Sequence, residues 1–293
     1  MVVPSRPRFD PFFRDPEHPV KPSAPGAVVI LVILIVLSLA AVAPLYWMFA
    51  TSLTPSALTV KFPPELVPSA PTLRNYQEVL AQPNFLRWVL NSLVQAVSVT
   101  LVTVATASMA GYALAKLPFR GSKSLFWLLI LSMMLPFEAI LVPLFLVVTR
   151  LGLVDTYLGL ILPLLVSPFS IFLMKQFIGT LPTELLDAAR VDGASEPRVF
   201  WDIVLPLVRP GLAFLGIITF VAQWNSFVWP LVVTRSSSMR TLQVGLVLIR
   251  EREPLFYGLH MAAAVLAAIP VVVIFFAFQK YFLRGVTVGA LKG

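Results

Sequence analysis

Long apolar runs alternate with short polar connections along this chain of 293 residues. A bilayer core about 30 Å thick is crossed by about 20 apolar residues in a helix. Several stretches meet or approach that length, at residues 26–50, 89–114, 124–148, 157–177, 212–233 and 259–279. The pattern predicts an all-α membrane protein, with six transmembrane helices in a domain of residues 26–293.

The second stretch is the least apolar, because hydroxyl and small side chains interrupt it. These residues are Ser92, Ser98, Thr100, Thr103, Thr106, Ser108 and Gly111. Side chains of this kind allow close contact between helices inside a membrane bundle. We therefore expect residues 89–114 to form an inner, packed helix.

The first stretch also has features of a secretory signal, since arginines precede it and Ala41-Val42-Ala43 is similar to a cleavage site. Its apolar run is too long for a signal, and it continues through Tyr46 to Phe49 into an aromatic interfacial belt. We interpret it as an uncleaved span. The prolines spread through residues 1–25 indicate a disordered cytoplasmic tail.

Composition excludes a soluble globule, since 58% of the residues are hydrophobic, 12% are charged and the mean hydropathy is +0.88. The absence of cysteine excludes disulfides and cysteine-bound metals. His18 and His260 lie far apart in the sequence. A histidine metal site or a Ser-His-Asp triad is therefore not expected, and no metal ligand is predicted.

The net charge of +8 raises the question of nucleic-acid binding. The basic residues are spread singly along loops instead of gathering with aromatic residues, so no nucleic-acid partner is expected. An even number of spans places both termini on one side of the membrane, and most of the 22 lysine and arginine residues then fall on that side. The positive-inside rule predicts that both termini are cytoplasmic and that membrane lipids surround the spans.

Residues 178–211, here called the acidic segment, form the longest predicted cytoplasmic connection. This segment carries the acidic residues Glu184, Asp187, Asp192, Glu196 and Asp202. Pro182 followed by Thr183 is typical of a helix start, with Thr183 as the cap, and Gly193 is able to take the positive φ that ends a helix. Ser195 caps a second helical stretch that runs until Pro206.

A helix of about nine residues is marginal by itself and needs a tertiary surface. Ala188 and Ala189 leave one side of this helix nearly flat, so that another backbone could approach closely. From the residues alone, two interpretations stay open. The acidic segment is either a docking element for a cytoplasmic partner or an ordinary hairpin.

The order Asp187-Ala188-Ala189, then Gly193, then Ile203-x-Leu205-Pro206 resembles the EAA loop of permeases of ATP-binding-cassette (ABC) importers. The string from Leu181 to Ala194 is similar to the maltose-type carbohydrate permeases. Residues 223–231 and 279–293 resemble the fifth-helix signature and the C-terminal tail of that family. The chain departs from the family at Asp187, where glutamate is usual, which shortens the reach toward a partner.

The resemblance implies a type I ABC importer permease fold in a bacterial or archaeal inner membrane. A second homologous permease would complete the pathway, and an extracytoplasmic solute-binding protein would deliver the solute. Two cytoplasmic ATPase subunits would bind ATP and Mg, because this chain has no GxxxxGK[ST] phosphate loop. The chain itself would bind no cofactor and would not be an enzyme.

In this family the EAA loop is the coupling helix that contacts an ATPase subunit. The resemblance assigns that contact to Glu184, Asp187, Ala188, Ala189, Asp192, Gly193, Leu205 and Pro206. The tail, residues 280–293, would insert between the ATPase subunits as an extended segment. Its predicted docking residues are Arg284, Gly285, Thr287 and Gly289, and the alternative is a frayed terminus.

Two groups are candidates for the translocation path. Glu138 is the one acidic residue within a predicted span, where it faces either the path or backbone groups freed at Pro136. The second group is Trp224, Asn225, Phe227 and Trp229, because sugars are held by aromatic faces and amide hydrogen bonds. Helix packing and an interfacial aromatic belt are the alternative for this group.

The resemblance implies uptake of a carbohydrate, such as a di- or oligosaccharide. Glycerol phosphate or another polyol-type solute is compatible with the same motifs. A secondary transporter is the alternative from a different class, but it would usually call for internal repeats or more buried ionisable groups. An intramembrane enzyme is disfavoured, since no HExxH or GxSxG motif occurs.

Overall fold

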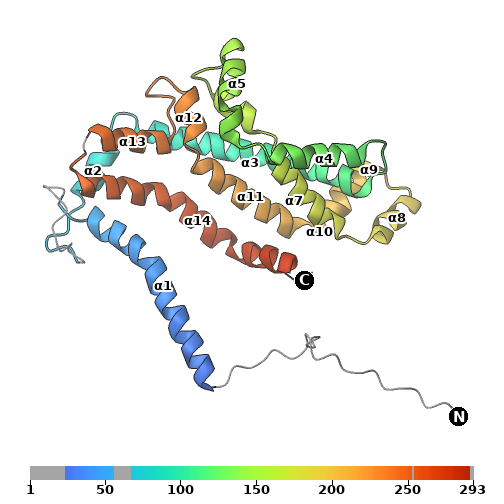
Figure 1. Cartoon of the computed structure of the whole chain (residues 1–293), viewed down its shortest axis with the longest axis horizontal. Coiled ribbons are helices and arrows are strands. Elements are labelled where there is room, and N and C mark those ends of the chain that lie inside the picture. The colour runs from blue at the N-terminus through green and yellow to red at the C-terminus, as the bar shows by residue number, and fades with distance from the viewer. Residues whose placement is uncertain (1–23, 56–66, 253, 291–293) are drawn as a thin grey trace. The chain divides into compact units, whose positions relative to one another are not determined.

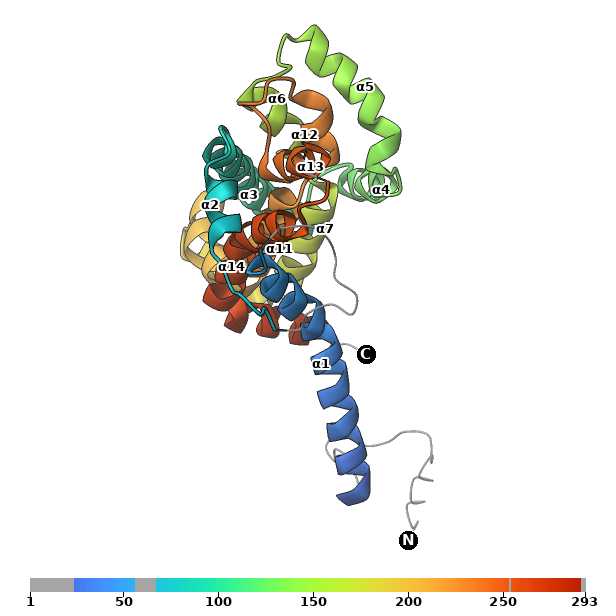
Figure 2. The same ribbon diagram turned by 90° about the vertical axis from the view of Figure 1, so that its left-hand side faces the viewer.

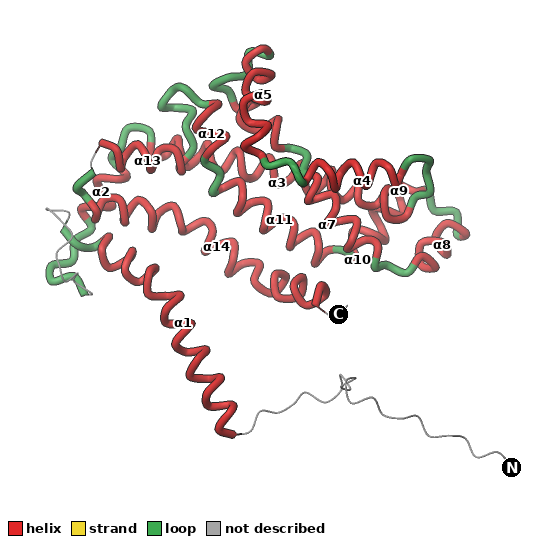
Figure 3. The backbone as a smooth tube through the Cα atoms, viewed as in Figure 1, coloured by secondary structure: helices red, strands yellow, loops and turns green. Residues whose placement is uncertain are grey.

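The structure is a computed structural model that describes residues 24–55, 67–252 and 254–290. These residues form helices joined by loops and turns, and they include no strand (Figure 3). The predicted all-α class is therefore confirmed for the described part of the chain. Two compact units are present, Met1–Trp47 and Met48–Gly293, and each is described by itself below.

The first helix, α1 (Ala24–Ser52), contains the first predicted span. The most apolar 18-residue window of Pro25–Ser52 has a mean hydropathy of 3.1, and none of its residues is buried within the structure. An exposed helix of this length and composition is suited to a lipid environment. The predicted tail lies almost entirely in residues 1–23, outside the described residues.

The second predicted span is the inner helix of the larger unit, as expected. Helix α3 (Phe85–Lys116) packs against α7 (Pro168–Gly179) and α11 (Arg209–Trp224), as Figure 1 shows. A Cβ on Gly111 would lie 2.8 Å from the backbone nitrogen of Lys175, so α3 and α7 approach closely at this glycine. The polar side chains that α3 buries are Asn91, Ser92, Gln95, Thr103 and Ser108.

The third predicted span, residues 124–148, is not one continuous helix. It consists of α4 (Ser122–Met133) and α5 (Phe137–Arg150), whose axes differ by 99°. The break lies at Pro136, which has an extended ψ of 141° and no backbone N–H to continue the helical hydrogen bonds. The apolar length of this stretch did not predict the break.

The fourth predicted span is also bent. The axes of Tyr157–Leu164 and of α7 differ by 45°. Helix α6 (Tyr157–Ile161) leads into a single 3₁₀ turn, η1 (Leu162–Leu164), before α7 begins. The hydroxyl of Ser167 accepts a hydrogen bond from the backbone N–H of Ser170 and caps α7. A capped new start within the apolar run explains why the run is not one helix.

The fifth predicted span, residues 212–233, is likewise divided. Helix α11 ends at Trp224, and α12 (Val228–Val233) follows after a short break. A helix through this break would place Pro230 where it lacks an N–H and clashes with the carbonyl of Ser226. The proline thus favours a new helix start over a continuous span.

The last predicted span lies in α14 (Tyr257–Ala290), and the most apolar 18-residue window of Tyr257–Gln279 has a mean hydropathy of 2.7. The extended conformation predicted for residues 280–293 is wrong as far as Ala290, where the backbone is helical. A helix satisfies the backbone N–H and C=O groups within the segment itself. Among the described residues, α1, α3 and α14 are each long and apolar enough to cross a membrane. By length and composition, up to six spans result if three bent pairs each count as one: α4 with α5, Tyr157–Leu164 with α7, and Glu196–Leu207 with Arg209–Trp224.

Two short helices lie at one end of the larger unit. Helices α2 (Arg74–Leu80) and α13 (Leu242–Arg252) pack against α14 and α3, and Figure 2 shows them from that end. Asn75 is buried and donates hydrogen bonds to the carbonyl oxygens of Ser52 and Thr54.

Candidate functional site

The acidic segment folds into two helical parts with Gly193 between them. Helix α8 (Thr183–Val191) comes first, and α9 (Glu196–Arg198) begins the second part. Gly193 has a φ of +85°, a conformation that favours glycine, so its predicted role as the helix end is confirmed.

The two predicted caps differ from the structure in detail. Pro182 occupies the cap position of α8, and Thr183 is the first helical residue, so the prediction of Thr183 as the cap is wrong. The Thr183 hydroxyl instead accepts a hydrogen bond from the Lys116 ammonium. Ser195 holds the cap position of α9, but its side chain makes no capping hydrogen bond.

The second helical part runs past the proline predicted to end it. After α9 come a π-helix, η2 (Val199–Val204), and a short helix, α10 (Leu205–Leu207). Pro206 lies within the first turn of α10, where its missing N–H costs no intrahelical bond. The predicted contact residues Leu205 and Pro206 are half-buried, and Leu205 packs into this chain's own core.

One side of α8 is anchored in the core and the other is exposed. Leu186 is fully buried and packs in a cluster with Tyr112, Met174 and Ile178. Predicted contact residues that are exposed are Glu184, Asp187, Ala188, Asp192 and Gly193, whereas Ala189 is half-buried. The helix therefore presents a mixed acidic and small-residue face to the surroundings.

Two exposed apolar side chains extend this face and were missed from the sequence. Val191 at the end of α8 is 87% exposed, and Trp201 in the π-helix is 64% exposed. Large exposed apolar groups outside the lipid-facing helices are typical of protein contact surfaces. Their only sequence signal was hydrophobicity within an acidic segment.

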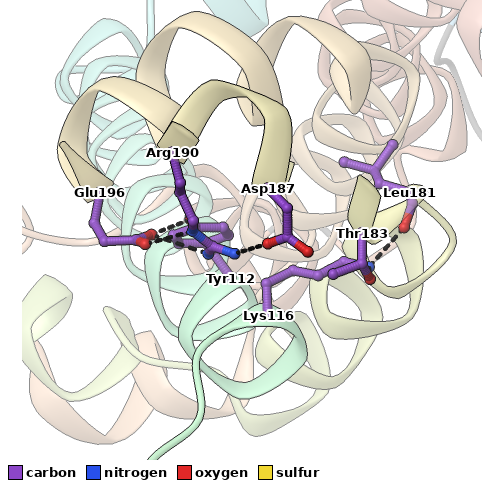
Figure 4. A network of polar contacts seen from close by, with 7 residues as sticks. All are labelled: Tyr112, Lys116, Leu181, Thr183, Asp187, Arg190 and Glu196. Atoms are coloured by element: carbon purple, nitrogen blue, oxygen red, sulfur yellow. Dashed lines mark hydrogen bonds and ion pairs between the residues drawn. The ribbon is translucent and has the colours of Figure 1, made fainter. Parts of the chain in front are cut away.

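Arg190 joins the two helical parts of the acidic segment, as Figure 4 shows. Its Nη1 donates to Oδ1 of Asp187 and its Nε donates to Oε1 of Glu196, each at 2.7 Å. The hydroxyl of Tyr112, on α3, donates to Oε2 of Glu196 at 2.5 Å. Asp187, predicted to meet a partner's charge, thus already has a cation within its own chain.

A second connection to α3 lies at the start of α8. Nζ of Lys116 donates to the carbonyl oxygen of Leu181 at 2.6 Å and to the hydroxyl of Thr183 at 3.3 Å. Tyr112 and Lys116 are four residues apart, so they lie one turn apart on the same face of α3. No local sequence pattern indicates either contact.

The charges in this network stabilise one another. The hydrogen bond to Glu196, followed by that to Asp187, raises the pKa of the Arg190 guanidinium above its ordinary value. The hydrogen bonds from Arg190 and then from Tyr112 lower the pKa of the Glu196 carboxyl. Both groups are therefore held in their charged forms.

The tryptophans proposed for the translocation path are packed inside this chain. Trp224 is 1% exposed, stacks on Phe220 and donates from Nε1 to the carbonyl oxygen of Ala267. Trp229 is equally buried and donates to the carbonyl oxygen of Leu160. Neither ring has a free face, so the packing alternative describes both residues.

Asn225 lies between these tryptophans and is exposed. It is the C-cap residue of α11, and its Oδ1 accepts a hydrogen bond from Nε2 of Gln243 at 3.3 Å. Phe227 is half-buried in the break before α12. Asn225 and Gln243 thus form an accessible amide pair, and Gln243 was missed from the sequence because it lies on α13.

Glu138 lies in the first turn of α5 and is exposed, next to the break at Pro136. A negative charge at this position is favoured by the helix dipole. The predicted tail residues Arg284, Gly285, Thr287 and Gly289 belong to α14, and their side chains lie outside the described part of the chain. Within the described residues, no three histidine, aspartate or glutamate side chains gather closely enough to hold a metal ion.

Comparison with known proteins identifies this arrangement. Residues 104–288 match the family described as binding-protein-dependent transport system inner membrane component. The chain belongs to this family. It is a permease of an ABC importer, and the resemblance inferred from its sequence motifs is confirmed. The matched region includes α8, the Arg190 network and the break at Asn225.

Curated relatives match the permease over most of their length. An arabinooligosaccharides transport system permease protein of Halalkalibacterium halodurans is 38% identical over 256 residues, covering 86% of this chain and 92% of the relative. An sn-glycerol-3-phosphate transport system permease protein of Yersinia pestis bv. Antiqua is 36% identical over 255 residues, covering 84% and 91%. These relatives are transport permeases, in agreement with the predicted class.

A solved structure shares the fold of the permease. A chain of a bacterial ABC transporter involved in the import of the acidic polysaccharide alginate superposes with a TM-score of 0.76, at 24% identity, covering 87% of this chain and 96% of that chain. The breaks at Pro136 and after Trp224 thus occur within an ABC importer permease fold.

Proposed function

We propose that this permease is one of two permease subunits of an ATP-driven importer, and that α8 is the helix that couples it to a separate ATPase. The observation that carries the proposal is the geometry of α8. Its buried side is fixed by Leu186, whereas its acidic and small residues face outward. A short helix held in this way is able to transmit force from a partner to the rest of the chain.

The proposal also covers the membrane spans, the termini and the ATPase subunits. The six spans are α1, α3, α4 with α5, α6 with α7, α11 and α14, and both termini are cytoplasmic, as the distribution of basic residues indicates. ATP and Mg are bound by two ATPase subunits, and this chain is a non-catalytic subunit. The tail containing Arg284 and Gly285 docks between those ATPase subunits.

The solute is proposed to be a di- or oligosaccharide delivered by an extracytoplasmic binding protein. Support comes from the 38% identical relative, whose name gives arabinooligosaccharides. A glycerol-phosphate or other polyol-type solute is the second candidate, favoured by the 36% identical relative. The hydrogen-bonded amide pair of exposed Asn225 and half-buried Gln243 is suited to the hydroxyl groups of either class.

Purification and uptake test the proposal together. The tagged permease, extracted from its native membrane, is expected to bring down a second permease and an ATPase. Vesicles of that complex with its binding protein are then supplied with ATP and either labelled arabinotriose or labelled sn-glycerol-3-phosphate. Accumulation of one solute identifies the class, whereas purification of the permease by itself would contradict the proposal.

A further inference from the structure

We infer that Tyr112 and Lys116 are positioning residues that clamp the two ends of α8 to a single turn of α3. The inference rests on the proposed function, because it assigns to these two residues the transmission of force between the coupling helix and the inner helix. Neither residue belongs to the acidic segment; Tyr112 is buried and Lys116 is half-buried.

The clamp contacts α8 at both ends. At the start, Nζ of Lys116 donates to the carbonyl oxygen of Leu181 at 2.6 Å. At the end, the Tyr112 hydroxyl donates to Glu196, which holds Arg190 in the last turn of α8. Because the two clamping residues lie one turn apart, α8 cannot tilt relative to α3 without breaking one of these bonds.

An apolar contact fixes the middle of α8 to the same turn. Leu186 is buried against the cluster that contains Tyr112, and the Tyr112 ring lies 5.4 Å from the ring of Phe200 on the π-helix. Tyr112 thus contacts the second helical part directly, through Glu196 and Phe200, and Glu196 connects it to Arg190 on α8. The segment and this turn of α3 therefore move together as a packed body, since closely packed side chains transmit displacement with little compression.

The far end of α3 carries polar contacts to other helices. Asn91 accepts a hydrogen bond from the Tyr157 hydroxyl at 2.6 Å, and Gln95 donates to Gln223 on α11 at 3.3 Å. From Tyr112 to Asn91, a helix with a rise of 1.5 Å per residue spans about 30 Å. A displacement at the clamp therefore reaches the part of α11 that precedes Asn225.

A role in folding alone would use the same contacts, so the test needs a measurement that responds to coupling. Stimulation of ATP hydrolysis by the binding protein is such a measurement, because the signal must cross the membrane through the permease. The complex is purified whole, and the probe is its binding protein as isolated from the native host with its own solute bound.

Three variants remove the clamp with small changes in shape: Tyr112→Phe, Lys116→Met and the two combined. Lys123→Met removes a nearby exposed lysine, and Asp202→Asn removes an exposed acid from the same segment, so these serve as matched controls. The clamp variants are expected to retain the ATPase in the complex and its basal hydrolysis. Their stimulation by the binding protein is expected to fall about five-fold or more, in the range typical of coupling energies.

Lys116→Arg keeps a charged donor and is expected to restore most of the stimulation lost in Lys116→Met. Full stimulation in the combined variant would overturn the inference, and so would a loss of stimulation equal to that in the control variants. A parallel fall in complex yield, basal hydrolysis and stimulation would show a structural role and would also overturn it. Failure of the parent permease to bring down any ATPase would instead contradict the proposed function itself.

Discussion

Arg190 and Glu196 form an ion pair of 2.7 Å across the turn at Gly193. The pair joins the last turn of α8 to the first turn of α9, so the two parts of the acidic segment hold a fixed angle. Tyr112 completes the arrangement from α3, 84 positions earlier in the sequence. The orientation of the proposed coupling helix thus depends on a few polar contacts near the protein surface.

Breaking the ion pair is expected to affect coupling more than stability. Side chains of Arg190 and Glu196 are 28% and 44% exposed, and pairs of this kind contribute about 0.2 to 1 kcal/mol. Glu196→Gln should therefore leave the Tm of the detergent-solubilised complex nearly unchanged while lowering binding-protein stimulation of ATP hydrolysis. The exchanged pair Arg190→Glu with Glu196→Arg should recover part of that stimulation, and a large drop in Tm would contradict this interpretation.

Substitution of Gly193 is expected to act through backbone strain. A Cβ at this position would meet no atom within 4 Å, so steric clash plays no part, but the φ of +85° disfavours side chains. Placing a non-glycine residue there costs about 1 to 2 kcal/mol, and least for asparagine. Uptake per ATP hydrolysed should be highest in the parent permease, lower in Gly193→Asn and lowest in Gly193→Val. All three proteins should insert equally into the membrane. Wild-type uptake by Gly193→Val would refute this order.

The Arg190–Glu196 pair is expected to persist across the neutral and mildly acidic range. The pKa of Glu196 is lower in the folded protein than its ordinary value. The stability that the ionised carboxylate contributes is therefore fully present above that ordinary value. It is lost only as the pH falls through the lowered pKa. Glu196→Gln should therefore lose the same fraction of the binding-protein stimulation of ATP hydrolysis at pH 8 and at pH 5. A loss that disappears at pH 5 would show that Glu196 is already protonated there.

Substitutions of the adjacent residues Trp224 and Asn225 are expected to have different effects on stability and uptake. Trp224→Ala removes a buried ring and its hydrogen bond to Ala267, and such truncations cost about 3 to 5 kcal/mol. It should lower the Tm and the yield of the assembled complex. Asn225→Ala removes an exposed amide and should leave the Tm unchanged while reducing uptake. Unchanged uptake in Asn225→Ala would remove this residue from the translocation path.

The sequence predicts which segments are helical better than it predicts where those helices break. Apolar length predicted where helices occur, and the hydroxyl-rich stretch correctly indicated the inner helix α3. The breaks at Pro136 and after Trp224 were not predicted, because hydropathy ignores the missing N–H of a proline. The tail was predicted as extended, yet the backbone is helical to Ala290.

In the candidate site, local chemistry was predictable and long-range contacts were not. Gly193 was recognised because a helix end requires a particular backbone conformation. Tyr112 and Lys116 were missed because their partners lie at least 65 positions away, at distances that no periodic pattern encodes. Trp224 and Trp229 were assigned by residue type, and only packing shows that their rings are covered.

The most direct test of the account is a cross-link from the exposed end of α8. The chain contains no cysteine, so Val191→Cys, at a position 87% exposed, is the single thiol on this subunit. A short thiol-to-amine cross-linker is added to the assembled complex in native membrane vesicles, with Leu101→Cys on α3 as the exposed control. The account predicts a covalent adduct between Val191→Cys and the ATPase, and none from Leu101→Cys. An ATPase that is present in the complex but forms no adduct with Val191→Cys would contradict the central claim.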